Sequence, residues 1–251
     1  MYGIIGGTGL ASIHELKISK REIIRTPFGE PSQPLIFGSF AGKDIVFLAR
    51  HGSGHTIPPH EINYRANMWA LQSVGVTHII SVATVGVIDD AVKPGTICIP
   101  HQIIDYTYGR KNTYFDGTDM PVKHIDFTHP YDETLRKEIV NIAKVTLKVV
   151  MTEGVYGAVQ GPRLETAAEI NRLEKDGVHI VGMTGMPEAA LAKELNLAYA
   201  AICPMVNHAA GRGQSKDVIS FSSINELCEN DVCRLMMADV IELIQAVIAK
   251  N

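Results

Sequence analysis

The sequence lacks the features that mark membrane proteins and nucleic-acid-binding proteins. No apolar run approaches the roughly 18 residues that a transmembrane helix needs, and no basic leader precedes the first apolar segment. The net charge of −4 over 251 residues provides no basic surface for nucleic acid or for an anionic membrane. These absences predict a cytoplasmic protein without nucleic-acid or membrane partners, in which local donors must hold any anionic ligand.

Cysteine is scarce and has no metal-type spacing. The four cysteines are Cys98, Cys203, Cys228 and Cys233. Buried free thiols in a reducing cytosol are therefore expected. His124, Asp126 and His129 lie close in sequence, but their spacing matches neither a helical nor a finger-type metal site, so no metal is expected.

Hydrophobic residues make up 46% of the chain, and its 22 glycines are typical of an α/β protein with many loops. Apolar runs predict strands over residues 2–5, 45–49, 78–83, 96–100, 147–152, 179–181 and 197–206, with further β structure within 21–49. Helices are predicted over 62–74, 132–145, 165–176, from 187 onward and over roughly 222–249. Because the chain has no repeat, low-complexity tract or linker, we expect one domain over residues 1–251.

The stretch Gly182–Lys193 links a buried strand to a helix. Pro187 suits the first helical position, and Glu188 suits the positive end of the helix dipole. Met183 and Thr184 would then lie at a strand-to-helix crossing, where open α/β sheets bind their ligands. The alternative is an ordinary turn with a methionine in the core.

Polar residues follow several other predicted strands. A glycine loop follows the first strand, Arg50 and His51 follow the strand over 45–49, and a second loop begins at Thr84. The glycine loop is not a complete dinucleotide fingerprint, because Ser12 stands where the last glycine belongs. The phosphate-type donors at these strand ends are Thr8, Arg50, His51, Thr84 and Thr184. Residues 105–131 are too long for a structureless internal loop unless they function or pack on a partner.

Six motifs in this order resemble those of the trimeric purine nucleoside phosphorylase and methylthioadenosine phosphorylase family, over nearly the whole chain. They are Gly6-Gly7-Thr8-Gly9, Arg50-His51-Gly52, Asn63-Tyr64-Arg65-Ala66-Asn67, Glu153-Gly154-Val155-Tyr156, Gly161-Pro162-Arg163-Leu164-Glu165, and Gly182-Met183-Thr184 through Pro187-Glu188. The chain departs from the family pattern at Thr84-Val85-Gly86-Val87, where a second glycine is usual after Gly86.

The resemblance implies an α/β fold whose mixed central sheet has partial barrel character and is flanked by helices. It also implies phosphorolysis, in which phosphate attacks C1′ of a purine nucleoside, with no metal and no cofactor besides this co-substrate. Thr8, Arg50, His51, Thr84 and Thr184 would hold phosphate. Met183 would lie beneath the ribose, and Leu164, Glu165 and Asn207 would contact the base, with Glu165 and Asn207 in the catalytic role. The family further implies a homotrimer with the site at a subunit interface.

Two positions predict the purine. Members that act on adenine nucleosides have Asp where this chain has Asn207 and Ala209. An amide donates and accepts, so Asn207 suits O6 and N7. Glu165 matches the carboxylate that accepts from N1–H of a 6-oxopurine, and adenine has no such proton. A 6-oxopurine, most simply hypoxanthine, is therefore expected.

The other end of the nucleoside is predicted from Phe221 and His124. Phe221 would favour an apolar methylthio group, and His124 matches the residue that a neighbouring subunit lends in the methylthio branch. The combination predicts 5′-methylthioinosine as substrate. Methylthioadenosine and inosine or guanosine are the alternatives within the same chemistry. A nicotinamide-dependent oxidoreductase and a non-catalytic nucleoside-binding module are the alternatives from other classes.

Overall fold

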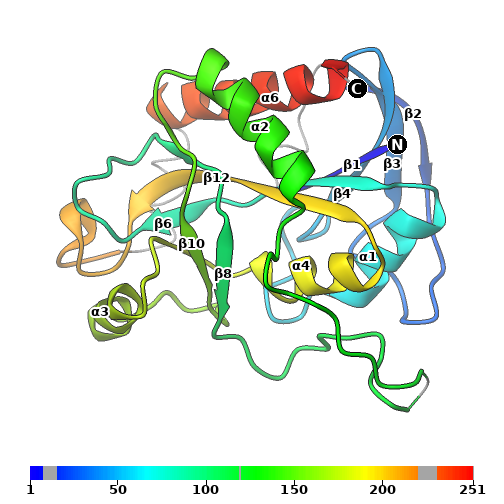
Figure 1. Cartoon of the computed structure of the whole chain (residues 1–251), viewed down its shortest axis with the longest axis horizontal. Coiled ribbons are helices and arrows are strands. Elements are labelled where there is room, and N and C mark those ends of the chain that lie inside the picture. The colour runs from blue at the N-terminus through cyan, green and yellow to red at the C-terminus, as the bar shows by residue number, and fades with distance from the viewer. Residues whose placement is uncertain (8–15, 119, 220–230, 251) are drawn as a thin grey trace.

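The structure, a computed structural model, describes residues 1–7, 16–118, 120–219 and 231–250. In this part of the chain one mixed sheet of 12 strands forms the centre, in the order β2-β3-β4-β1-β5-β12-β6-β11-β10-β8 (Figure 1). Beside this path β7 pairs with β12, and β9 pairs with β7. The first strands are β1 (Tyr2–Gly6), β2 (Lys17–Glu22), β3 (Leu35–Phe40), β4 (Lys43–Ala49), β5 (His78–Val82) and β6 (Val85–Val87). The others are β7 (Ile97–Cys98), β8 (Gln102–Asp105), β9 (Val150–Met151), β10 (Val155–Ala158), β11 (Ile180–Gly182) and β12 (Ala198–His208).

The long strand β12 joins two parts of the sheet. Its first half pairs with β5 in parallel, and its second half pairs with β6 and β7. The register shifts between Met205 and Asn207, and such a bulge bends a strand and increases its twist. The predicted mixed sheet with helices around it is confirmed.

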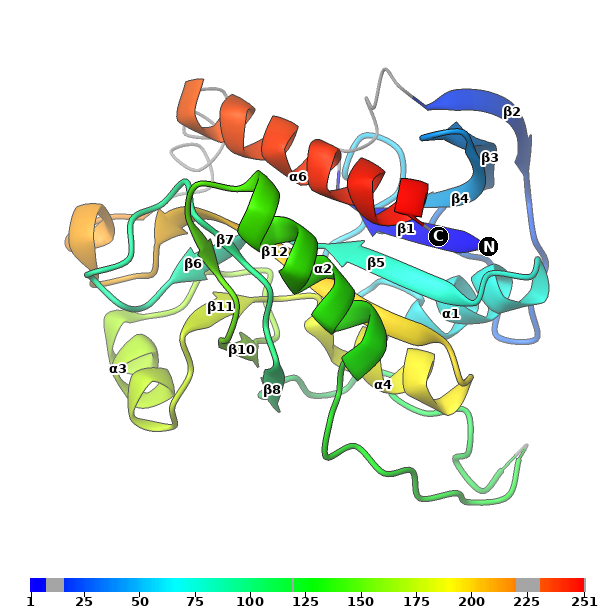
Figure 2. The same ribbon diagram turned by 45° about the horizontal axis from the view of Figure 1, so that its top comes forward.

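Helices cover both faces of the sheet. Figure 2 shows α2 (Glu133–Thr146) and α6 (Asp231–Lys250) on one face, with α1 (Tyr64–Ser73) and α4 (Gly185–Glu194) on the other. Neighbouring strand residues point to opposite layers: Ile4 packs in the cluster with α2 and α6, whereas Ile5 packs in the cluster with α1 and α4. Burial on both faces explains why the central strands are continuous apolar runs.

Most predicted elements are confirmed, and α3 (Ala167–Lys175) begins after Thr166, which caps it together with Glu169. Met186 has non-helical φ and ψ of −122° and 139°, so the regular turns of α4 begin at Pro187 as predicted. The predicted loop at Thr84 is shorter than expected, because Val85 already begins β6. Of the predicted last helix, residues 222–230 lie outside the described ranges. Within those ranges no helix combines the length and apolar character needed to cross a membrane.

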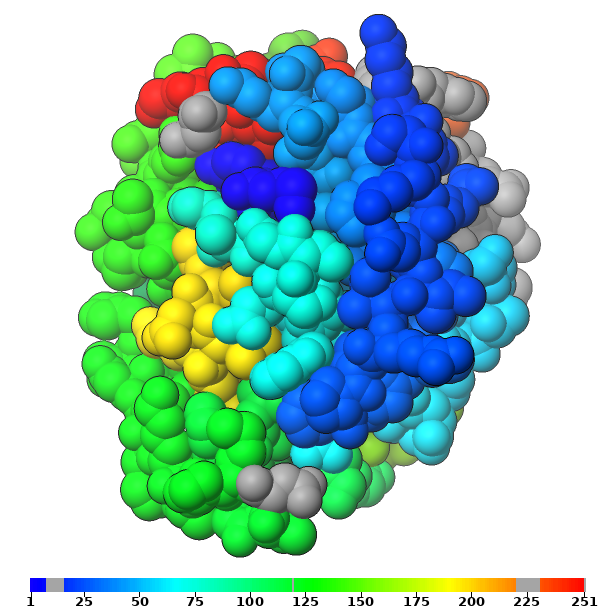
Figure 3. Space-filling model, turned by 90° about the vertical axis from the view of Figure 1, so that its right-hand side faces the viewer, coloured from blue at the N-terminus to red at the C-terminus, as the bar shows by residue number. Residues whose placement is uncertain are grey.

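The segment 106–131 has no helix or strand in its described residues and runs away from α3 (Figures 1 and 2). It is anchored where the Tyr114 amide and the Thr113 hydroxyl donate to Glu194 of α4, at 2.8 and 2.6 Å. Figure 3 shows its residues in green beside α4 in yellow. The expectation of one domain over residues 1–251 stays a prediction.

Candidate active site

The carboxyl ends of three parallel strands meet at one edge of the sheet. β1 lies between β4 and β5, with Gly6 opposite Ala49 and Ile5 opposite Ser81. The Arg50 amide donates to the Gly6 carbonyl at 2.9 Å, so the residues after β1 and after β4 start side by side. Thr84 follows β5 and is exposed. Thr8, predicted to belong to this group, lies outside the described residues.

Arg50 is buried at this edge with an exposed fraction of 1%. Its Nε and Nη2 donate to the two carboxylate oxygens of Glu188 at 2.6 and 2.9 Å. Nη2 also donates to Ser81 Oγ at 2.7 Å, and Nη1 donates to the Val82 carbonyl at 3.1 Å. A guanidinium has five N–H groups, so these four bonds within the described chain leave one Nη1 hydrogen for a ligand.

Glu188 is the residue whose role the sequence did not reveal. It is not a surface acid at a helix end but is fully buried. Besides Arg50, the hydroxyls of Ser81 and Tyr199 donate to its Oε1, both at 2.8 Å. Burial opposes ionisation of this carboxyl, but the Arg50 charge and these hydrogen bonds hold its pKa below the usual range. Glu188 therefore fixes the direction of the Arg50 guanidinium.

The loop from Gly182 to Gly185 follows the surface of a buried tyrosine. The Thr184 amide donates to Tyr156 Oη at 3.4 Å. A Cβ at Gly182 would lie 2.2 Å from Tyr156 Oη, and one at Gly185 would lie 2.9 Å from Tyr156 Cε1. Both positions therefore require glycine for this close approach. The sequence shows Tyr156 only as the last residue of the motif that begins at Glu153. Gly182 and Gly185 are the sequence signal that a large side chain packs against this loop.

Met183 packs against the loop that precedes Glu165. Gly161 has a φ of +61°, and a Cβ there would lie 2.5 Å from Met183 Sδ. The two predicted ligand loops are thus in direct contact through this glycine.

Gly161→Ala is expected to lower the melting temperature by ~2–8 °C, because a left-handed conformation costs about 1–2 kcal/mol at a non-glycine residue. It should also lower kcat/KM, since the new methyl group displaces Met183. Gly177→Ala is the matched control: its φ is +88°, and no described atom lies within 4 Å of the added Cβ. Thermal unfolding and nucleoside turnover of both variants separate strain from displacement, and an equal kcat/KM in the two would contradict the assigned contact.

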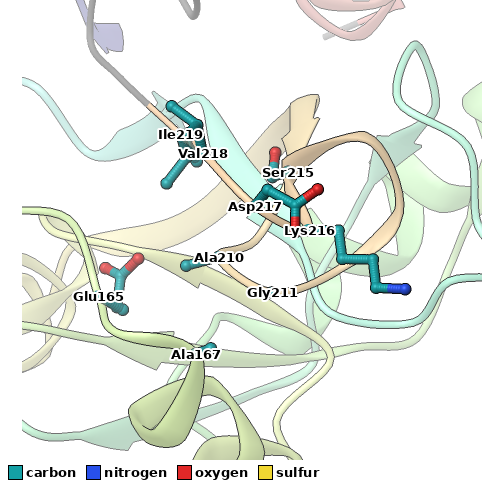
Figure 4. A pocket seen from close by; sticks show the side chains of 9 residues that line it. All are labelled: Glu165, Ala167, Ala210, Gly211, Ser215, Lys216, Asp217, Val218 and Ile219. Atoms are coloured by element: carbon teal, nitrogen blue, oxygen red, sulfur yellow. The ribbon is translucent and has the colours of Figure 1, made fainter.

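A cavity of about 360 Å³ opens beside the loop after β10 and the end of β12. Its lining consists of Glu165, Ala167, Ala210, Gly211, Ser215, Lys216, Asp217, Val218 and Ile219. Figure 4 shows the Glu165 carboxyl across from Ala210, with Val218 and Ile219 on another side, whereas Lys216 points away. Burial raises the pKa of the Glu165 carboxyl. A carboxyl group beside apolar walls suits a planar ring with an N–H at its edge.

Asn207 lies at the bulge of β12, shortly before the part of the cavity wall that begins at Ala210. The residue is buried, and its Nδ2 donates to the His208 carbonyl at 2.6 Å. A Cβ at Gly86, opposite on β6, would lie 3.4 Å from the same Nδ2. The Asn207 amide therefore lies directly over Gly86. Leu164 is half-buried next to Glu165.

His51 is buried beside Arg50 and is held in one tautomer. Its Nδ1 lies 2.9 Å from the Ile57 carbonyl, which only accepts, so Nδ1 carries the hydrogen and Nε2 is the acceptor in the neutral ring. Its ring stacks on His55 with centroids 4.1 Å apart. Burial and the Arg50 charge lower the pKa of His51 to about 4, so the ring is neutral at neutral pH.

Two predicted ligand residues are not brought to the site by the described chain. His124 is exposed on the segment 106–131, which runs away from α3. Phe221 lies outside the described residues. Among the described residues, no three or more His, Cys, Asp or Glu side chains lie together in a way that would hold a metal ion. Cys98, Cys203 and Cys233 are buried, as predicted, and no disulfide joins them within the described ranges. Cys228 lies outside those ranges.

Fold and site together define an α/β protein with a buried cation and a ring-sized cavity at the ends of its strands. Residues 1–242 match the family model of the phosphorylase superfamily. The chain belongs to this family.

Several relatives are similar over most of their length. A probable S-methyl-5′-thioinosine phosphorylase from Pseudomonas syringae pv. tomato is 49% identical over 226 residues, covering 90% of this chain and 91% of the relative. A 6-oxopurine nucleoside phosphorylase from Pyrococcus furiosus is 40% identical, covering 94% and 91%. The solved structure of methylthioadenosine phosphorylase from Schistosoma mansoni in complex with adenine has a TM-score of 0.88 at 30% identity, covering 100% of this chain and 92% of that one.

Proposed function

We propose that this enzyme of the purine nucleoside phosphorylase type cleaves 5′-methylthioinosine. A phosphate oxygen attacks C1′, the bond from C1′ to N9 breaks, and hypoxanthine and 5-methylthioribose 1-phosphate are formed. The observation that carries the proposal is the Glu165 carboxyl in the ring-sized cavity, next to the loop that contacts Met183. The names of the two relatives, a methylthioinosine and a 6-oxopurine enzyme, support the same reading.

Phosphate would bind at the edge where β1, β4 and β5 end. Arg50 supplies the charge and its remaining Nη1 hydrogen, with Thr84, Thr184, His51 and Thr8 as further partners. The neutral His51 would accept from the P–O–H group of hydrogen phosphate by its Nε2 lone pair, since Nδ1 faces the Ile57 carbonyl. Because Glu188 holds the guanidinium in place before phosphate arrives, little reorganisation is needed on binding.

The base would be read by Glu165 and Asn207. An ionised Glu165 accepts from N1–H of hypoxanthine, whereas adenine would place a lone pair there, a mismatch that costs roughly 1–3 kcal/mol. The second Asn207 amide hydrogen would donate to O6, its Oδ1 would accept from N7–H once N7 is protonated, and Leu164 would pack against the ring. As the purine leaves, Asn207 stabilises the negative charge that develops on it.

No covalent nucleophile is needed for this reaction. The transition state resembles an oxocarbenium ion, so the protein must place phosphate beneath the sugar and stabilise the leaving purine. Met183 would lie beneath the ribose, between these two partners. Inorganic phosphate is a co-substrate, and the mechanism assigns no step to a metal or an organic cofactor.

The 5′ end would be closed by Phe221 and by a neighbouring subunit in a cytoplasmic homotrimer. His124 would come from that neighbour, because it is exposed on the segment 106–131, whose course in Figure 1 leads away from α3. The same segment exposes Tyr108 and Val122 by 72% and 64%, which is apolar surface for a partner to cover.

The reaction is tested by incubating the protein with 5′-methylthioinosine in buffer with and without phosphate, and by following hypoxanthine by chromatography and the sugar product by phosphorus NMR. The proposal expects base release only with phosphate and one sugar phosphate formed per base. Release of free sugar without phosphate would make the protein a hydrolase instead. An absorbance change that depends on a nicotinamide cofactor would favour an oxidoreductase.

A further inference from the structure

Arg110 joins two loops of the proposed site by its guanidinium. It lies in the segment between β8 and α2, outside every motif that indicated phosphorolysis. One side of the guanidinium faces the loop after β10: Nη2 donates to the Gln160 carbonyl at 2.7 Å and Nε donates to Gln160 Oε1 at 3.1 Å. The other side faces the loop after β11: Nη1 donates to the carbonyls of Met183 and Met186 at 2.8 and 2.6 Å.

We propose that Arg110 is a positioning residue of the phosphorolysis site, acting through Met183 and Gln160. Gln160 directly precedes Gly161, against which Met183 packs, and Glu165 lies five residues after Gln160. The two carbonyls that Arg110 holds flank Thr184. One side chain therefore sets the relative position of the elements assigned to ribose, phosphate and base.

The flat fork of arginine is essential for this arrangement. The N–H groups of a guanidinium point outward in different directions within one plane, so a single arginine can donate to carbonyls on two loops. Tyr64 supports the fork from α1, with its hydroxyl 3.2 Å from Nη1 and its ring centroid 5.5 Å from the guanidinium carbon. Lysine places its donors on one nitrogen atom and cannot bridge the same groups.

The chain contains a matched control in Arg136 of α2. Arg136 is buried, and its guanidinium also donates to backbone carbonyls, those of Ile99, Pro100 and Thr152. These carbonyls lie outside the proposed site. Loss of the Arg136 bonds should therefore affect stability alone, whereas loss of the Arg110 bonds should affect the reaction.

The test compares the full-length wild type with Arg110→Lys and Arg136→Lys in thermal unfolding and steady-state phosphorolysis. Arg110→Lys should lower kcat/KM about 100-fold, most of it in kcat, because an error of about 1 Å in orientation has this effect. Arg136→Lys should lower the melting temperature at unchanged kcat/KM. Arg110→Ala should regain part of its kcat when guanidinium ions are added below the denaturing range.

If the wild type is active and either Arg110 variant has the same kcat/KM as the wild type, the positioning role is overturned. A loss in Arg110→Lys that only follows the unfolded fraction would overturn it as well. The inference rests on the proposed function, but the two fail differently: a wild type that releases no base from any purine nucleoside would refute the function before any variant is compared.

Discussion

Arg50→Met is expected to destabilise the protein by about 3–5 kcal/mol and to abolish phosphate-dependent turnover. The substitution leaves the buried carboxylate of Glu188 without its cation, and among the described side chains the hydroxyls of Ser81 and Tyr199 still donate to it. It also removes the buried positive charge that we propose binds phosphate. Urea unfolding measures the first effect, and base release from nucleoside with phosphate measures the second.

The double variant Arg50→Met/Glu188→Gln separates these two effects. Removing both charges eliminates the uncompensated burial, so most of the lost stability should return. Turnover should stay absent, because the phosphate ligand is still missing. A double variant that recovers turnover together with stability would show that Arg50 acts on the fold alone. A non-catalytic binding module would lose no turnover in either variant, because it has none.

Glu165→Gln is expected to lower kcat/KM for 5′-methylthioinosine about 10–100-fold. A hydrogen bond to a charged partner contributes roughly 1.5–3 kcal/mol, and the neutral amide keeps only part of it. The loss for methylthioadenosine should be smaller, because adenine has no N1 hydrogen for the carboxylate to accept. The ratio of the two kcat/KM values should therefore fall.

The same variant should change the pH profile. Burial raises the pKa of Glu165 above its ordinary value of 4.5, and the ionised form is the one that accepts from N1–H. As pH falls through this raised pKa, the carboxyl protonates and kcat/KM for an oxopurine nucleoside decreases. Glu165→Gln should lack this decrease at low pH, the acid limb of the profile.

Glu169→Gln is the matched control for both measurements, because the Arg163 side chain and the Thr166 amide lower the pKa of Glu169 to about 2. It should keep the preference for the oxopurine and an acid limb. That limb should move to lower pH, because the Glu169 charge contributes to the raised pKa of Glu165. An acid limb that persists in Glu165→Gln would assign the titration to another group and contradict the role given to Glu165.

The central strands and helices were predictable because the pattern of apolar residues within each segment indicates which of its residues are buried. β4 and β5 are covered on both faces, and their apolar runs follow directly from that. β2 was missed because all six of its residues are exposed, so no apolar pattern marks it. The strand at Val85 was missed because its pairing depends on the bulge of β12, more than a hundred residues away.

The site was predictable where a residue type carries its own chemistry, as with Arg50 and Glu165. Long-range partners were not. In sequence, Glu188 looks like an ordinary acidic residue in a first helical turn. Nothing near it indicates that Arg50, 138 residues away, donates a hydrogen bond to it. Arg110 had no signal beyond its place in a long polar segment, because its bonds go to backbone carbonyls that any sequence would offer.

The most direct test of the proposed substrate is phosphate-dependent base release measured in parallel from 5′-methylthioinosine, methylthioadenosine, inosine and guanosine. The structure and the relatives lead us to expect the highest kcat/KM on 5′-methylthioinosine and little turnover of methylthioadenosine. Equal or better use of inosine would contradict an apolar 5′ pocket. A preference for methylthioadenosine would contradict the reading of the base by Glu165 and Asn207, and no release from any of the four would contradict phosphorolysis itself.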